Sequence, residues 1–405
     1  MRQLKALFLS TCNSGVIYWR IQNFVEAAWR TGLASFQHPL WIKDRNSMQE
    51  WQGKLTDGPK YDPLYLRAFV PMIESGCREA DVVVFQYVQE EGALELFDSI
   101  KTRFPDLPIL TEIDDNLLSV PRYNEANMTY DPRSEVRRRA LDQIKASDGV
   151  IVSTPGLKTV YSEFNDNIHV IPNCIDFGLW NRAKRKSRPG LRIGWAGGGN
   201  HEGDVAAIQN AIKNTLKNHP SVKFVFVNGP GFHGLPDFLR NVPGVEHHAI
   251  WAPILKYPQM LASMDFDIII SPLVDSAFNR GKSNLKWLEA AALGIPCIAS
   301  NVGHYAETLR TGDDCVLADD EKEFELALDV LIRDRKRRKD IGKAAHARAM
   351  RDFNVDTVVR KYVDCLQSAA NIKACGLAAN TSTTAADAIP SDYDTSLAIR
   401  QELPA

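Results

Sequence analysis

The chain has 405 residues, which is enough for two domains that each bury an apolar core. Its formal net charge is −2 and 24% of its residues are charged, so the composition excludes a protein dominated by nonspecific nucleic-acid binding. The seven cysteines are scattered without close pairs, which argues against a structural zinc site, and no apolar run approaches the roughly 18 residues that span a bilayer. We expect a cytoplasmic protein with reduced thiols, and the composition permits peripheral contact with a membrane.

Short apolar runs alternate with helical stretches along the first half of the chain, which is typical of parallel α/β layers. Strands are predicted over residues 5–10, 81–86, 108–112 and 149–153, and a helix is expected near residues 17–30. The run Val82–Phe85 is apolar on both faces, as a buried parallel strand requires. A further strand near residues 167–172 leads into the turn Asn173–Asp176, which we take as the end of a first domain at residues 1–176.

The second half begins with a change of composition. Residues 181–190 are basic and poor in apolar side chains, so we place an interdomain linker at residues 177–190. A second α/β series, with strands near 191–195, 223–227, 245–248 and 266–271, predicts a second domain at residues 191–354. Residues 355–372 should form a helix that returns to the first domain, and residues 373–405, rich in Ala, Thr, Ser and Asp, should be a disordered tail.

The segment from residue 278 to residue 300 reads as a cationic loop, a helix and a short strand. The loop carries Arg280 and Lys282, and Ser283 is the expected N-cap of the helix. Free helix amides near Ser283 and Asn284 carry partial positive charge, which suits a diphosphate.

Glu289 lies about two turns into that helix, where its carboxylate is placed to accept hydrogen bonds from ribose hydroxyls. Lys282, Lys286 and Glu289 fall on one helical face. The alternative reading is an exposed ion pair between Lys286 and Glu289, which would contribute little to stability.

A glycine-rich turn follows the first strand of the second domain. Gly197, Gly198 and Gly199 allow backbone amides to approach a bulky anionic ligand, and Asp204 is placed to cap the next helix. His201 is a candidate contact to a phosphate or sugar. The alternative is an ordinary strand-to-helix turn, and the spacing does not match the glycine pattern that binds dinucleotides.

The 278–300 segment and the Asn173–Asp176 turn resemble the GT-B glycosyltransferases, in particular the family 4-like group (glycosyltransferase group 1). The resemblance implies an α/β fold of two Rossmann-like domains that face a central cleft. It places the nucleotide sugar on the second domain and the acceptor on the first. This chain departs from the family pattern in one respect: the family has two glutamates with seven residues between them, of which the second is Glu289, and the position of the first is Gly281. The family's Arg and Lys are also missing from the glycine-rich turn, so Arg280 and Lys282 are expected to replace them.

The same resemblance implies further donor contacts. Trp251 would lie beside the base, although packing in the core is as good a reading, and Asn279 would touch sugar hydroxyls. From its position after the first strand, Gly15 is a candidate to let the backbone of the first domain approach the donor phosphates or the acceptor. Arg20 is a candidate for holding an acceptor anion, with an ordinary surface position as the alternative.

Two adjacent carboxylates, Asp114 and Asp115, follow a predicted strand of the first domain. Open α/β sheets bind ligands at such strand ends, and paired carboxylates can act as a general base. A turn cap is the alternative. Because GT-B enzymes generally use no metal, the resemblance favours a base or acceptor-orienting role and predicts no metal site.

These observations predict transfer of a sugar from a nucleoside-diphosphate sugar to a hydroxyl acceptor without another cofactor. The resemblance implies retention of configuration. The acceptor could be a glycan, a lipid-linked or small molecule, or a hydroxylated DNA base. Basic runs at residues 137–139, 184–186 and 333–339 keep DNA and an anionic membrane among the candidate partners, although most such runs are solvated surface. The alternatives are a sugar-nucleotide epimerase and a non-catalytic binding module of the same shape.

Overall fold

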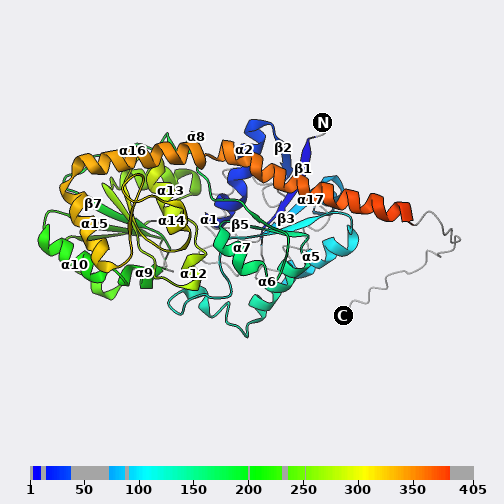
Figure 1. The fold of residues 1–405 in the computed structure, drawn as a ribbon, viewed down its shortest axis with the longest axis horizontal. Helices are drawn as coiled ribbons and strands as arrows, with labels where there is room; N and C mark the ends of the chain where they lie inside the picture. Colours follow the sequence, from blue (N-terminus) through cyan, green and yellow to red (C-terminus); the bar gives the residue numbers. More distant parts are fainter. Residues whose placement is uncertain are drawn as a thin grey trace, which may run out of the picture.

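The computed structural model describes residues 3–10, 15–37, 73–86, 91–198, 201–229, 236–250 and 252–383. These residues form two six-stranded parallel sheets that lie in separate domains (Figure 1). The predicted fold class, an α/β protein of two Rossmann-like domains, is confirmed. In the described ranges, no helix combines the length and apolarity needed to cross a bilayer.

The first sheet is built from strands between residues 4 and 170. Its spatial order is β2 (Ala34–Gln37), β1 (Leu4–Leu9), β3 (Val82–Gln86), β4 (Ile109–Ile113), β5 (Gly149–Val152) and β6 (Ile168–Val170). All five pairings are parallel. Every residue of β3 and β4 is buried, as expected for central strands covered by helices on both faces.

The second sheet has the order β12 (Val316–Ala318), β11 (Cys297–Ser300), β10 (Ile268–Ser271), β7 (Arg192–Ala196), β8 (Lys223–Asn228) and β9 (Val245–Ala249). Its pairings are also parallel. The chain order reverses between β7 and β10. In open α/β sheets, ligands bind beyond the carboxyl ends of the strands at such a switch point.

Helices cover both sheets (Figure 1). In the first domain and the crossover they are α1 (Gly15–Ile17), the π-helix η1 (Tyr18–Gln22), α2 (Asn23–Thr31), α5 (Glu91–Arg103), η3 (Glu125–Asn127), α6 (Glu135–Ala146), α7 (Pro155–Tyr161) and α8 (Phe177–Trp180). In the second domain they are α9 (Glu202–Ala206), α10 (Gln209–Asn218), η5 (Asp237–Leu239), η6 (Ile254–Lys256), α11 (Tyr257–Ser263), α12 (Ala277–Arg280), α13 (Leu285–Ala292), α14 (Gly303–Thr308), α15 (Glu321–Arg333) and α16 (Arg335–Asp352).

The last helix, α17 (Val355–Thr383), runs back along the first domain (Figure 1). Its Tyr362 stacks on Phe24, with ring centroids 4.6 Å apart. The two crossings between the domains lie side by side, because Ile175 donates to the Phe353 carbonyl at 2.8 Å and accepts from Val355 at 3.0 Å.

The helix extends beyond the end that the sequence analysis assigned. We expected a helix within residues 355–372 and a disordered tail from residue 373, but α17 continues to Thr383. Ala374, Ala378, Ala379 and Leu377 have high helix propensity, which outweighs the low propensity of Gly376 between them. Residues 384–405 lie outside the described part of the chain.

Candidate functional site

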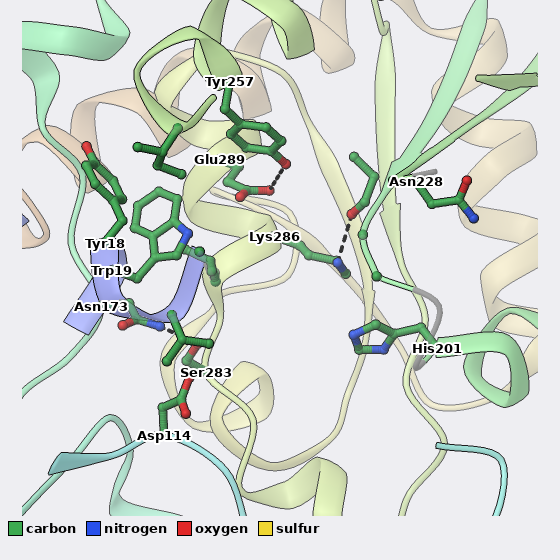
Figure 2. Close-up of a pocket in the computed structure, with 18 of the residues that line it drawn as sticks. Tyr18, Trp19, Asp114, Asn173, His201, Asn228, Tyr257, Ser283, Lys286 and Glu289 are labelled. Atoms are coloured by element: carbon green, nitrogen blue, oxygen red, sulfur yellow. Dashed lines mark hydrogen bonds between the residues drawn. The ribbon is translucent and has the colours of Figure 1, made fainter. Parts of the chain in front are cut away.

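A cavity of about 450 Å³ lies between the two domains, beyond the carboxyl ends of β7, β8 and β10 (Figure 2). Nine of the predicted site residues line it: Gly15, Asp114, Asp115, Gly197, Gly198, His201, Lys282, Ser283 and Glu289. The fold therefore brings predicted site residues from four separate segments of the chain to one place. Their individual roles stay predictions.

Helix α13 directs Glu289 into this cavity, and the side chain is only 7% exposed. The Tyr257 hydroxyl donates to Glu289 Oε2 at 3.2 Å (Figure 2). Burial raises the pKa of Glu289 to about 7, although the nearby Lys286 opposes that rise. The carboxyl group therefore ionises near neutral pH. Its protonated form both donates and accepts hydrogen bonds, whereas its carboxylate form is a strong acceptor for hydroxyl groups.

Lys286 also lies in the cavity wall rather than on the surface. Its Nζ donates to the Ala196 carbonyl at 2.8 Å and sits 5.1 Å from the centroid of the Trp195 ring. Burial lowers the pKa of Lys286, and the charge of Glu289 partly offsets this. The expected alternative, an exposed ion pair between Lys286 and Glu289, is wrong because both groups are withdrawn from solvent and Lys286 bonds to the backbone.

This lysine explains why residue 197 is glycine. A Cβ atom at Gly197 would lie 2.5 Å from Lys286 Nζ and 2.8 Å from the Trp195 ring. At Gly198, by contrast, a Cβ atom would have nothing within 4 Å. The first glycine thus makes room for a protein side chain, and the second borders open space in which a ligand can approach the backbone.

A salt bridge joins the two domains across the cavity. Lys282 Nζ lies 2.7 Å from Asp115 Oδ1 and 4.6 Å from the centroid of the Phe278 ring. The adjacent Asp114 has its Oδ1 buried with no hydrogen-bond partner among the described residues. Burial, together with the charges of Asp115 and Glu112, raises the pKa of Asp114 to about 8. The two neighbouring carboxyl groups thus differ: Asp115 is ion-paired, whereas Asp114 can hold a proton at neutral pH.

His201 is held by Asp204, with Nδ1 and Oδ2 2.7 Å apart. Burial lowers the pKa of His201 to about 4, although the bond to Asp204 opposes this, so the ring is neutral at pH 7. Because the Asp204 carboxylate only accepts, Nδ1 carries the ring proton and Nε2 is left as an acceptor. An acceptor can bind a sugar hydroxyl but not a phosphate oxygen, because phosphate oxygens only accept. Of the two contacts expected for His201, the geometry therefore favours the sugar.

Comparisons with known proteins agree with this geometry. Residues 209–364 match the family model described as glycosyl transferase-like. No curated protein matches the chain. Among solved structures, HepE of Anabaena in complex with UDP-glucose is similar over 90% of this chain and 100% of its own, with a TM-score of 0.62 and 16% identity. This chain has the GT-B fold.

Two other GT-B structures give the same result. Sucrose-phosphate synthase from Thermosynechococcus elongatus is similar with a TM-score of 0.60 and 15% identity, over 91% of this chain and 99% of its own. The catalytic domain of starch synthase IV from Arabidopsis thaliana, bound to ADP and acarbose, has a TM-score of 0.63 and 12% identity over the same shares. The predicted resemblance to GT-B glycosyltransferases of the group 1 type is confirmed.

Within this GT-B frame, two predicted contacts to the donor do not reach the cavity. Arg280 is exposed and makes two bonds of 2.7 and 2.8 Å to Asp275, because the short helix α12 turns its side chain outwards. Asn284 is buried and donates to Thr308 Oγ1 at 3.3 Å. Asn284, not Ser283, is the N-cap residue of α13, and Ser283 therefore faces the cavity.

Asn279 and Asp204 support the site instead of lining it. Asn279 is buried and donates to Asp204 Oδ1 at 2.7 Å. Asp204 also accepts from the Val274 amide at 2.9 Å and from the hydroxyl of Tyr123, in the first domain, at 3.2 Å. We expected Asp204 to cap the next helix, but it lies inside the first turn of α9 and is fully used in this network.

Arg20 is not available to an acceptor. Its side chain is 0% exposed and its Nε lies 2.5 Å from Glu112 Oε1. One terminal nitrogen donates to the Ile171 carbonyl at 2.8 Å and to Asn173 Oδ1 at 2.9 Å. The predicted role in binding an acceptor anion is therefore withdrawn, because Arg20 neutralises a buried carboxylate inside the first domain.

Some cavity residues were missed by the sequence analysis. The π-helix η1 places Tyr18 and Trp19 at the cavity, and Tyr257 lines it next to Glu289 (Figure 2). Spacing alone gives no sign of a π-helical turn, although such turns are frequent at functional sites. Two other predicted donor contacts, Gly199 and Trp251, lie outside the described residues.

The position of the missing family glutamate is closely packed. A Cβ atom at Gly281 would lie 2.9 Å from the Leu157 side chain and 3.5 Å from the Asn116 side chain. The Gly281 carbonyl also accepts from the Thr154 hydroxyl at 2.9 Å. Residue 281 is thus part of the contact between the domains, where a larger side chain would force them apart.

Proposed function

We propose that the protein transfers a sugar from a nucleoside-diphosphate sugar to a hydroxyl acceptor. The observation that carries this proposal is the single cavity in which Glu289, Lys282 and Asp114 meet. The glycosyl transferase-like match over residues 209–364 supports it. Further support comes from the ligands named for similar structures, UDP-glucose with HepE and ADP with starch synthase IV.

The second domain would hold the donor. In our proposal Glu289 accepts hydrogen bonds from the ribose hydroxyls, with Tyr257 keeping its carboxylate in place. The diphosphate would lie at the start of α13, near the Ser283 hydroxyl and Lys282. The open space above Gly198 gives the sugar phosphate access to the backbone, and His201 Nε2 would accept from a sugar hydroxyl.

The first domain would hold the acceptor. Asp114 would bind and orient the reacting hydroxyl, since it lines the cavity beside the ion-paired Asp115. The bond from the anomeric carbon to the diphosphate breaks while a bond to the acceptor oxygen forms. In the retaining reaction that we propose, the acceptor proton passes to the departing diphosphate. Lys282 and the helix start would stabilise the charge on that leaving group, so that no cofactor or metal is required. The free, buried Cys297 and Cys315 support a reducing, cytoplasmic location.

A donor screen tests the proposal. The wild-type protein is heated with UDP-, ADP- and GDP-sugars, and a bound donor should raise the melting temperature by mass action. Glu289→Ala should abolish the shift, whereas Arg280→Ala should leave it unchanged because Arg280 lies outside the cavity. A wild-type protein that binds none of these donors would refute the proposal.

Turnover then separates the proposed reaction from its rivals. Incubation with the bound donor and a panel of glycan, lipid-linked and hydroxymethylated DNA acceptors should give a transfer product. An isomerised nucleotide sugar formed without acceptor would identify an epimerase. Binding with neither transfer nor slow donor hydrolysis would identify a binding module.

A further inference from the structure

A line of hydrogen bonds connects the core of the first domain to the start of helix α13. Gln86 Nε2 donates to Glu112 Oε2 at 3.1 Å, and Arg20 Nε donates to Glu112 Oε1 at 2.5 Å. Arg20 then donates to Asn173 Oδ1 at 2.9 Å, and Asn173 Nδ2 donates to Ser283 Oγ at 2.8 Å (Figure 2). Ser283 is the one member of this line from the second domain, and it lines the cavity.

The chemistry of the partners fixes the direction of each bond. A guanidinium group has only donors, so the Asn173 amide must turn its oxygen towards Arg20. Its NH₂ group then faces Ser283, and the Ser283 oxygen must act as the acceptor. The Ser283 hydroxyl proton is thereby directed away from Asn173. No residue in the described part of the chain accepts it, and the partly exposed side chain borders the cavity.

We propose that Asn173 is a positioning residue, which holds the Ser283 hydroxyl as a hydrogen-bond donor to the diphosphate of the sugar donor. This inference rests on the proposed function. The added point is that Asn173, in the first domain, sets the direction of the hydrogen bond that Ser283, in the second domain, donates to the ligand. Phosphate oxygens only accept, so a Ser283 hydroxyl turned the other way would present its lone pairs to them. A hydrogen bond to a charged group changes affinity by about 10- to 100-fold.

The Asn173→Asp variant tests the direction directly. It keeps the shape of the side chain but replaces the NH₂ group with a second oxygen. That oxygen would accept from Ser283 and turn the hydroxyl away from the cavity. We expect UDP to bind at least about tenfold more weakly in calorimetry, with uridine binding unchanged because uridine has no phosphate. Ser283→Ala should show the same selective loss, and Ser283→Thr should retain much of the wild-type affinity for UDP.

A second background separates this effect from simple charge repulsion. Asn173→Asp adds a negative charge, which would weaken UDP binding whether or not Ser283 is present. In a Ser283→Ala background we therefore expect the Asn173→Asp substitution to weaken UDP binding by less than about threefold. A full tenfold loss in that background, or an equal loss of uridine binding, would overturn the inference.

Two further outcomes are distinguishable. If Asn173→Asp does not fold, Asn173→Ala replaces it. That variant leaves the Ser283 hydroxyl unfixed and should weaken UDP binding only while Ser283 is present. If ADP or GDP is the nucleotide that binds, that nucleotide and its nucleoside replace UDP and uridine. A wild-type protein that binds none of the three nucleotides refutes the proposed function, whereas tight binding of the nucleotide by Ser283→Ala refutes only this inference.

Discussion

Replacing Asp114 by asparagine should make the protein more stable at neutral pH while stopping sugar transfer. Burial and the charges of Asp115 and Glu112 raise the pKa of Asp114 from 3.8 to about 8. Between these values the unfolded chain has lost the proton and the folded chain still holds it. The unfolded state therefore binds fewer protons, and the free energy of unfolding falls as the pH rises from about 4 to about 8.

The size of the effect follows from the same two values. At pH 7 the loss of stability has accumulated over the roughly 3 pH units between 3.8 and 7. At about 1.4 kcal/mol per unit, this amounts to about 4 kcal/mol. Because the side chain is partly exposed to the cavity, solvent screening reduces this, and we expect about 1–2 kcal/mol. Asparagine cannot ionise and avoids the penalty. For a domain of this size the gain corresponds to a rise in melting temperature of roughly 2–8 °C.

Melting temperatures of wild type and Asp114→Asn at pH 5.5, 7.0 and 8.5, followed by circular dichroism, measure this gain. The difference should grow with pH. Asp275→Asn is the matched control, since Asp275 is an exposed carboxylate paired with Arg280 outside the cavity. A variant that is less stable than wild type at pH 7, or a difference independent of pH, would contradict the reasoning. In parallel, Asp114→Asn should bind the donor but show no transfer.

Three other changes have specific expected outcomes. Donor affinity of the wild type should rise as the pH increases through about 7, because Glu289 ionises there; Glu289→Gln should weaken binding about tenfold and remove the pH dependence in calorimetry at pH 6 and 8. Gly197→Ala should lower stability by about 1–3 kcal/mol, because its new methyl group meets Lys286 and the Trp195 ring, whereas Gly198→Ala should melt like wild type. Arg20→Met should cost about 3–5 kcal/mol in urea unfolding, since it leaves a buried carboxylate unpaired, and an unchanged midpoint would show that the ion pair contributes little.

Sequence patterns predicted the structure best where a short run of residues by itself determines whether a side chain is buried or faces the cavity. The all-apolar run Val82–Phe85 can only be a buried strand, and the position of Glu289 on a helix after a loop directs it towards the neighbouring strand ends. The parallel sheets and much of the cavity wall follow from such patterns. The division into two domains also followed from the basic segment at residues 181–190, and the family resemblance added that the two domains face a central cleft, which local patterns do not specify.

The errors concern the rotation of side chains about their helices. Arg20 and Arg280 were both read as cations facing a ligand, but one is fully buried and the other is exposed. The π-helical turn η1 contains an extra residue, which shifts the side-chain directions that an α-helix would give and brings Trp19 to the cavity. Lys286 was undervalued because its partner is the carbonyl of Ala196, and backbone acceptors leave no trace in a residue pattern.

The return of α17 to the first domain has a consequence for biosynthesis. Its Val359, Tyr362 and Leu366 belong to the same buried cluster as Phe8 and Phe24. The first domain is thus assembled from two stretches of chain, with the whole second domain made between them. At about 5–20 residues per second, a ribosome needs roughly 10–40 s to produce that interval. Until α17 is made, the apolar surface around Phe8 and Phe24 stays uncovered. The second domain can therefore fold before the first domain is complete.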